Sequence, residues 1–438
     1  MFRDGELILY RNFKRGDILN DMSRLVYEYE FGYDEEEHVD YRTLLFDIVS
    51  RLVELATDHG YRGNLWQMYL TYLLANNENS YSMAAELRGS VPGTINELAL
   101  HDFAIFKEMF DYDFAEVAEA LNIECINLIL DYDGVDDAGK IFNKRVRDRI
   151  CELGTALAGA ATPQAFMDTV SGFYKCFGVG KFGLHKAFRV DHNRKDEVVI
   201  RPITNIAHVY LEDLVGYKIA KQKLIENTEA FVEGRRANNC LLFGDAGTGK
   251  SSAIKGIMNR YYDKGLRIIE LYRHQFRDIN DVIAQLKTRN YKFIIYMDDL
   301  SFEEFETDYK YLKAVIEGGL EKKPSNILIY ATSNRRHLIK ETWSDRDDIR
   351  VDNGIHKSDT MQEKLSLAYR FGVSIYFEKP NKKEFHEIVR TLAAKNNIDM
   401  PEEELLAKAD KWELAHGGLS GRTAQQFVDH ILGTAHKL

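Results

Sequence analysis

Two glycines, a lysine and a serine in the spacing G-x-x-x-x-G-K-S are the residues of this sequence best suited to chemistry. They occur in the stretch CLLFGDAGTGKSS at 240–252. Glycines let successive backbone N–H groups turn toward one anion, and the helix that follows adds the positive end of its dipole. In this pattern the lysine reaches the β- and γ-phosphates and the serine hydroxyl holds Mg²⁺. The residues predicted to cradle the phosphates are Gly244, Asp245, Ala246, Gly247, Thr248, Gly249, Lys250, Ser251 and Ser252.

Hydrolysis of a bound nucleotide also needs a metal ligand and a group that orients water. Asp298 and Asp299 directly follow the apolar run FIIYM. We predict that Asp298, with Ser251, holds Mg²⁺ directly or through its second shell, and that Asp299 is the base or orients the water. Asn334 follows the run ILIYA and is predicted to bond the attacking water or the γ-phosphate. The alternative for all three is a helix cap, because Asp and Asn favour that position.

Positive charge on the γ-phosphate is the remaining requirement. Arg370 lies just before the run VSIYF, and Arg422 opens the last helical segment. Taken singly, each is an ordinary surface arginine.

The elements that must position these groups are short apolar runs alternating with helices. Such runs, not strictly alternating in polarity, are typical of parallel strands buried on both faces, and an open parallel sheet binds ligands at its strand ends. After the last strand the chain is predicted to be helical, and a polar segment at 341–363 separates the last two strands. The expected strands are 238–243, 266–271, 293–297, 327–331 and 373–377.

The part of the chain before residue 135 is predicted to be mostly helical, including one helix over 114–130. A literal G-x-G-x-x-G at Gly178, Gly180 and Gly183 is not interpreted as a dinucleotide site, because a helix precedes it and a β-hairpin at 186–201 follows. These glycines are expected to allow close packing.

Charge is unevenly distributed along the 438 residues, whose formal net charge is −11. Residues 1–140 carry 11 Lys and Arg against 28 Asp and Glu, a net of −17, and the rest carries 47 against 41, a net of +6. The acidic part is not suited to phosphate contacts with nucleic acid and either faces a basic partner or keeps the chain soluble. Acidic loops at 34–37 and 131–137 are interpreted as solvated rather than metal-binding.

Several classes of protein are disfavoured by composition. No run of eighteen apolar residues is present, the first residues are too polar for a signal peptide, and the four cysteines form no C-x-x-C pair. We therefore expect a cytoplasmic protein without a membrane segment.

The whole arrangement resembles the AAA+ ATPase superfamily from about residue 211 to 438. The resemblance implies that Lys250 and Ser251 are the Walker A pair, Asp298 and Asp299 Walker B, Asn334 sensor 1, Arg370 an arginine finger acting in trans, and Arg422 sensor 2. DDLSFE, ATSNRRHL and YRFG, with FYKCFGVGKFGLHKAFRV before them, look similar to an uncharacterised bacterial AAA+ family. One departure is Asp299, where the superfamily usually has Glu. Another is the segment YRHQFR after the second strand. Many members that unfold proteins have an aromatic–apolar–Gly loop at this place, and this segment has no glycine.

The resemblance also implies a fold and partners. The fold is a parallel five-stranded α/β sheet in the order 5-1-4-3-2 with a helical lid, and copies form rings or filaments with ATP at their interfaces. The expected domains are an acidic helical domain (1–140), a helix plus β-hairpin connector (141–204), the nucleotide-binding domain (205–379) and the lid (380–438).

The predicted function is slow Mg²⁺-dependent hydrolysis of ATP, coupled to remodelling or assembly of an unidentified protein partner through the acidic domain. One alternative is a nucleotide-gated scaffold with little turnover. Another is a nucleic-acid remodeller of the helicase-loader kind, for which the net +6 of residues 141–438 is the motive.

Overall fold

The computed structural model describes residues 2–31, 41–90, 92–121, 123–134, 142–206, 209–301, 308–317, 324–334 and 368–435. The polar segment predicted at 341–363, the acidic loop at 34–37 and part of the one at 131–137 lie outside these residues. The chain divides into two compact units, Met1–His185 and Lys186–Leu438. The domain boundaries expected within them stay a prediction.

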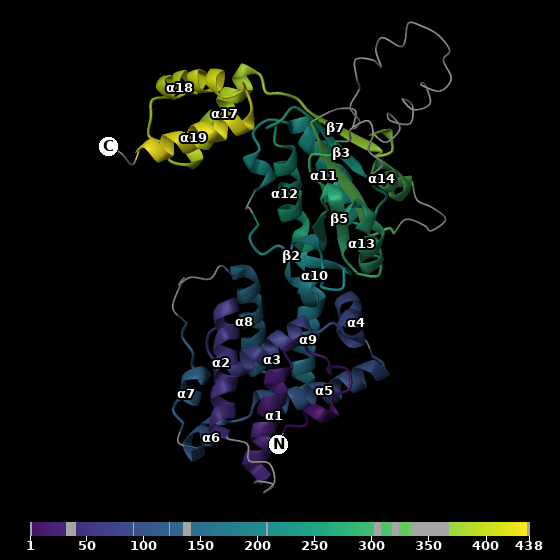
Figure 1. Cartoon of the computed structure of the whole chain (residues 1–438), viewed down its shortest axis with the longest axis vertical. Coiled ribbons are helices and arrows are strands. Elements are labelled where there is room, and N and C mark those ends of the chain that lie inside the picture. The colour runs from purple at the N-terminus through teal and green to yellow at the C-terminus, as the bar shows by residue number, and fades with distance from the viewer. Residues whose placement is uncertain are drawn as a thin grey trace. The chain divides into compact units, whose positions relative to one another are not determined.

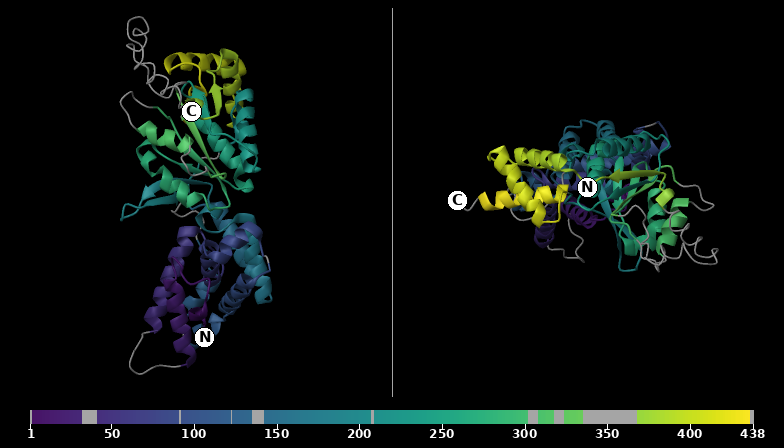
Figure 2. Two further views of the ribbon diagram at one scale, coloured as in Figure 1. Left: turned by 90° about the vertical axis from the view of Figure 1, so that its right-hand side faces the viewer. Right: turned by 90° about the horizontal axis from the view of Figure 1, so that it is seen from above.

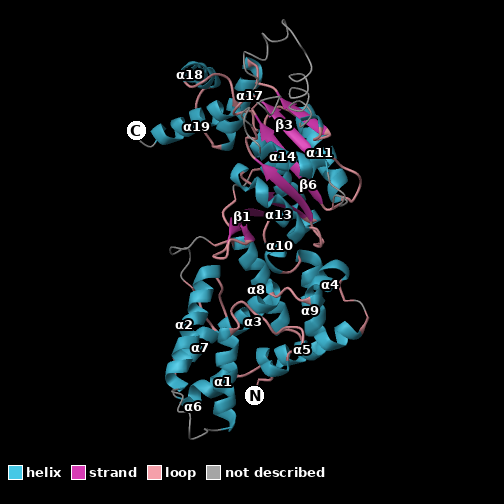
Figure 3. Ribbon diagram, turned by 45° about the vertical axis from the view of Figure 1, so that its right-hand side comes forward, coloured by secondary structure: helices cyan, strands magenta, loops and turns pink. Residues whose placement is uncertain are grey.

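The regular elements described in the first unit are all helices (Figure 3). They enclose an aromatic core in which Trp66 is buried and donates from its indole nitrogen to the Met109 carbonyl at 2.8 Å. The buried Asp102 carboxylate accepts backbone N–H groups of residues 8, 9 and 10, which ties the first residues to this core. The helices are η1 (Asp4–Glu6), α1 (Asp17–Phe31), α2 (Tyr41–His59), α3 (Leu65–Asn76), α4 (Ser80–Arg88), α5 (Thr94–Phe110), α6 (Phe114–Leu121), α7 (Cys125–Leu130), α8 (Lys144–Ala158), α9 (Pro163–Phe177) and α10 (Gly180–Leu184).

The single helix predicted over 114–130 is wrong, because the structure has two helices, α6 and α7. The Ile123 N–H bonds back to the Ala118 carbonyl at 2.9 Å, which closes the end of α6 before α7 begins at Cys125.

Gly178 follows α9, Gly180 begins α10 and Gly183 lies within α10, so the element directly before the motif is a helix. A Cβ on Gly183 would lie 2.5 Å from the Gly178 carbonyl carbon, and one on Gly180 would lie 2.3 Å from a carboxylate oxygen of Glu78. These glycines therefore serve close packing, as expected.

The second unit is built on one sheet, and the prediction of five strands is wrong. Within the described residues the sheet has seven strands in the order β2-β1-β4-β5-β6-β3-β7. The five predicted strands occupy consecutive places from β7 to β4, in the 5-1-4-3-2 order, and the hairpin adds two more. β1 pairs parallel with β4, which would otherwise be an open edge, and antiparallel with β2. The strands are β1 (Ala187–His192), β2 (Val198–Pro202), β3 (Cys240–Gly244), β4 (Leu266–Glu270), β5 (Lys292–Met297), β6 (Ile327–Ser333) and β7 (Val373–Phe377).

Helices cover both faces of this sheet, which is why its central strands are almost wholly buried. α11 (Lys218–Val232) and α12 (Lys250–Tyr261) lie on one face, and α13 (Ile279–Leu286) and α14 (Asp308–Glu317) lie on the other (Figure 1). Short 3-10 helices η2 (Leu211–Asp213), η3 (Tyr262–Lys264) and η4 (Arg273–Asp278) connect them. Among the helices described in the whole chain, none is long and apolar enough to span a bilayer.

Three helices after β7 form a small bundle of their own, the lid (Figure 2). α17 (Lys382–Lys395) begins with a reciprocal capping box between Asn381 and Glu384. α18 (Glu402–Ala415) and α19 (Gly421–Ala435) complete the bundle around Phe385 and Phe427.

Candidate functional site

The turn between β3 and α12 is compact because its glycines adopt conformations and contacts that other residues do not. Gly249 precedes α12 with φ +90°, and Gly244 ends β3 with φ +139°. A Cβ on Gly244 would lie 2.1 Å from the Phe377 carbonyl oxygen on β7. The Thr248 hydroxyl donates to the Asp245 carbonyl at 2.8 Å and closes the turn. The helix therefore starts directly at Lys250, with its first N–H groups beside the loop.

The Lys250 ammonium lies inside this turn. The residue as a whole is 7% exposed. It donates to the carbonyls of Gly244 at 2.8 Å and Asp245 at 2.7 Å, and to Asn334 Oδ1 at 3.0 Å. Burial lowers the pKa of Lys250, although nearby carboxylates, Asp299 foremost, oppose the shift. All three acceptors are uncharged oxygens, so the ammonium keeps its positive charge available to an anion in the loop.

The Asp298 carboxylate collects three hydroxyl donors on its Oδ1 atom. Ser251 Oγ lies 2.8 Å away, Tyr296 Oη 2.7 Å and Thr332 Oγ1 2.5 Å. Partial burial alone would raise the pKa of Asp298, but these hydrogen bonds outweigh it and the pKa is lowered. The acid is therefore held as a carboxylate next to the first residues of α12.

Asp299 is oriented by two contacts with β6 and the residue after it. Its backbone N–H donates to Thr332 Oγ1 at 3.0 Å, and its Oδ1 accepts from Asn334 Nδ2 at 2.8 Å. Its φ is +50°, a left-handed conformation that Asp and Asn tolerate better than most residues. Asn334 thus links Lys250 to Asp299 through the two ends of its amide.

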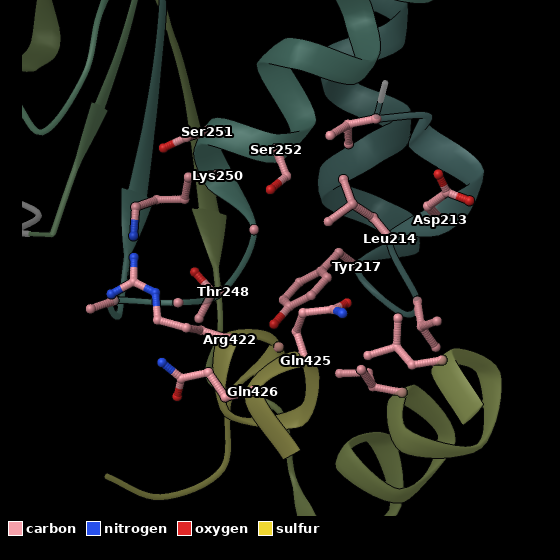
Figure 4. A pocket seen from close by; sticks show the side chains of 18 of the residues that line it. Asp213, Leu214, Tyr217, Thr248, Lys250, Ser251, Ser252, Arg422, Gln425 and Gln426 are labelled. Atoms are coloured by element: carbon pink, nitrogen blue, oxygen red, sulfur yellow. The ribbon is translucent and has the colours of Figure 1, made fainter. Parts of the chain in front are cut away.

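The lid reaches the loop through the start of α19. The Arg422 N–H donates to the Gly247 carbonyl at 3.3 Å. Figure 4 shows the Arg422 guanidinium and the Lys250 ammonium pointing toward the same corner of the pocket. A second contact joins the lid to the rest of the unit. Lys395 of α17 forms a 2.7 Å ion pair with Asp213 of η2, and this pair lowers the pKa of Asp213.

Most of these residues line one cavity of about 850 Å³ between the turn and the lid. That volume is in the range of small-molecule sites, roughly 300–1,000 Å³. One end carries Lys250, Ser251, Asp298, Asp299, Asn334 and Arg422. The other end is formed by apolar side chains of the segment before α11 and of α17, namely Val209, Leu214, Val215, Ile388 and Leu392.

The structure brings most predicted site residues together at this cavity. Those that line it are Ala246, Gly247, Thr248, Gly249, Lys250, Ser251, Ser252, Asp298, Asp299, Asn334 and Arg422. Gly244 and Asp245 contribute through their carbonyls, which accept from Lys250. Arg370 is not brought to the cavity; it lies in the turn before β7, next to Tyr369, which is 78% exposed.

Sequence reasoning missed Tyr296, Thr332 and the Lys395–Asp213 pair. A tyrosine two residues before Asp298, the one hydroxyl in the otherwise apolar run FIIYM, was a signal for the first. A threonine two residues before Asn334 was a signal for the second. The ion pair joins residues 182 positions apart and left no local pattern.

The donor set fits a Mg²⁺ ion that is carried by a nucleotide. Within the described residues, no group of three or more His, Cys, Asp or Glu is arranged to hold a metal. Mg²⁺ commonly takes one or two protein ligands, phosphate oxygens and several waters. The Ser251 hydroxyl directs its hydrogen at Asp298, which leaves its oxygen lone pairs for a cation.

Comparison with known proteins gives one family match. A family described as "Protein of unknown function (DUF815)" matches residues 184–435, more than half of the chain. No curated protein matches the sequence.

Solved structures similar to the chain include RuvB proteins of Thermotoga maritima. A structure of the RuvB Holliday junction branch migration motor has 15% identity and a TM-score of 0.37, and the match covers 51% of this chain and 64% of that one. A point mutant of the same RuvB has 16% identity and a TM-score of 0.37, with 51% and 65% covered. The chain thus spans just under two thirds of the length of these RuvB chains.

Proposed function

The chain belongs to the DUF815 family of proteins of unknown function, and we propose that it is a Mg²⁺-dependent ATPase that couples its nucleotide state to a protein partner. This membership confirms the predicted resemblance to an uncharacterised family, and we propose that the family lies within the AAA+ superfamily. One observation carries the proposal. Lys250, the Ser251–Asp298 pair, the Asp299–Asn334 pair and Arg422 converge on a single cavity that also has an apolar end.

In the proposed reaction Lys250 and the N–H groups at the start of α12 bind the β- and γ-phosphates. Ser251 and Asp298 would hold Mg²⁺, which when bound would neutralise charge on the phosphate oxygens. Asp299, aimed by the Asn334 amide, orients the attacking water and accepts its proton. Arg422, which lines the same cavity, would add positive charge that stabilises the charge accumulating on the γ-phosphate in the transition state.

Coupling to a partner follows from the two contacts that join the lid to the rest of the site. The Arg422 N–H bond to Gly247 lies at the phosphate end, and the Lys395–Asp213 ion pair lies at the apolar end. A nucleotide in the cavity would contact both, so its binding and hydrolysis would move the lid relative to the sheet. We propose that a protein bound elsewhere, through the acidic N-terminal residues, responds to this movement.

A nucleotide-gated scaffold is the second candidate, and the geometry of Asp299 favours it. The side chain is one methylene shorter than the usual Glu, and one of its oxygens is already bonded to Asn334. A protein of this kind would bind ATP tightly and assemble without measurable phosphate release.

Replacing Arg422 tests whether the lid contributes a charge to the reaction. Arg422→Ala is expected to lower steady-state phosphate release about 100-fold, because one preorganised charge at the transition state is lost. ATP binding, measured by titration with a fluorescent analogue, should weaken far less. Arg390→Ala is the matched control, since Arg390 is also a lid arginine but pairs with Glu402 away from the cavity. Equal turnover by both variants would contradict the role of Arg422.

Arg370 lies outside its own cavity, so we propose that it completes the site of a neighbouring copy. Light scattering with ATP, with ADP and without nucleotide should show an oligomer in at least the ATP sample. Arg370→Ala is expected to bind ATP as wild type does. Its rate of phosphate release should fall at least about 1,000-fold, which is the effect of removing an arginine finger. A monomer in all three samples would remove this role.

A further inference from the structure

Tyr296 places a hydroxyl in a strand whose other buried side chains are apolar. It is the fifth residue of β5, is 5% exposed, and packs in the core beneath α12. Its hydroxyl donates to the Asp298 Oδ1 atom at 2.7 Å. The tyrosine therefore reaches from the core to the acid that follows it in the chain.

The same oxygen also accepts from Thr332 of β6 and from Ser251 of α12. Three donors from three different elements thus fix one carboxylate oxygen, which leaves the carboxylate little freedom to rotate. Thr332 has a second task, because its oxygen accepts the Asp299 N–H. One pair of buried hydroxyls consequently sets the positions of both acids.

We propose that Tyr296 is a positioning residue, assisted by Thr332, that holds the Asp298 carboxylate in the orientation needed to bind Mg²⁺ together with Ser251. This inference rests on the proposed function. Tyr296 does not line the cavity, and it acts through Asp298. Without its hydroxyl the carboxylate rotates, the Ser251 hydroxyl loses its fixed acceptor, and Mg²⁺ is held less tightly.

A matched control is present on the neighbouring strand. Tyr330 is the partner of Tyr296 in the β5–β6 register and is also buried in the same layer. Its hydroxyl bonds instead to Thr228 at 3.0 Å and accepts from Asn227 at 2.9 Å, both on α11. Tyr330→Phe therefore removes the same atom from the same layer without touching the acids.

The experiment titrates Mg²⁺ into the full-length protein in the presence of a fluorescent ATP analogue. Tyr296→Phe is expected to need about 10-fold more Mg²⁺ for half-maximal enhancement of binding, as for other residues that support metal ligands. Its affinity for the analogue without Mg²⁺ should stay within about two-fold of wild type, since the phosphate loop is intact. Tyr330→Phe should match wild type in both measurements. Tyr296→Phe loses one hydrogen bond and Tyr330→Phe loses two, so Tyr296→Phe is not expected to melt at a lower temperature than its control.

Thr332 supplies a second arm in case Tyr296→Phe does not fold. Thr332→Ser keeps the hydroxyl and should behave as wild type, whereas Thr332→Val should show the same increased Mg²⁺ requirement. The inference would be overturned if Tyr296→Phe and Tyr330→Phe had equal Mg²⁺ requirements, or if the two Thr332 variants did. The proposed function would survive that result, provided that wild type binds ATP and Mg²⁺. A wild-type protein whose ATP binding does not respond to Mg²⁺ would overturn the proposed function as well.

Discussion

Lys250→Ala is expected to weaken ATP binding at least about 100-fold, the largest effect of any single change on affinity, because the main charge facing the phosphates is removed. The structure gives a physical reason beyond charge. The ammonium bridges the carbonyls of Gly244 and Asp245 to the Asn334 amide, so it also connects the phosphate loop to the end of β6. Titration with a fluorescent ATP analogue measures the loss.

Two further variants separate the charge from its structural role. Lys250→Met keeps most of the side-chain length and packing, and it should bind ATP as poorly as Lys250→Ala while melting closer to wild type. Lys255→Ala changes an exposed lysine of the same helix, which does not line the cavity, and should bind ATP as wild type does. ATP binding by Lys250→Met at wild-type affinity would show that the ammonium does not hold the phosphates.

Asp299→Asn is expected to leave ATP binding intact and to lower phosphate release at least about 100-fold, the size of a typical general-base contribution. The amide has almost the same shape as the carboxylate and keeps an oxygen for the Asn334 Nδ2 donor, so the local structure should be preserved. What it loses is the negative charge that accepts a proton. Asp281→Asn, at an exposed position on α13, is the control and should hydrolyse ATP as wild type does.

The backbone at Asp299 also bears on the departure from the usual Glu. A φ of +50° favours a short side chain that can bond locally, and Glu is less tolerated there. Asp299→Glu is therefore expected to hydrolyse ATP no faster than wild type. A large gain in turnover would mean that the position of the acid is limited by side-chain length and not by the backbone.

The parallel sheet was predictable from sequence because its strands are short apolar runs bounded by helices. The convergence of Asp298, Asn334 and Lys250 was predictable for the same reason, since the carboxyl ends of parallel strands meet at one edge. The place of the hairpin was not, because the pattern of 186–201 predicts a hairpin but holds no information about which strand it pairs with. In the structure it extends the sheet beside β4.

Contacts that depend on side-chain direction were also beyond the sequence. Tyr296 and Tyr330 occur at equivalent places in two similar strands, FIIYM and ILIYA, yet one hydroxyl reaches the acids and the other reaches α11. The lid contacts join segments far apart in the chain, and their pairing follows from packing of the whole unit. Arg370 lies just before β7, as its place in the sequence predicts, whereas its role in a neighbouring copy was predicted through a resemblance and stays a proposal.

Steady-state phosphate release by the full-length protein with saturating ATP and Mg²⁺ tests the central claim most directly. The account predicts slow but measurable release that requires Mg²⁺, is lost in Asp299→Asn, and is retained in Asp281→Asn. Tight ATP binding by wild type with phosphate release no greater than in Asp299→Asn would contradict catalysis and favour the nucleotide-gated scaffold. Absence of ATP binding by wild type would contradict the nucleotide site itself.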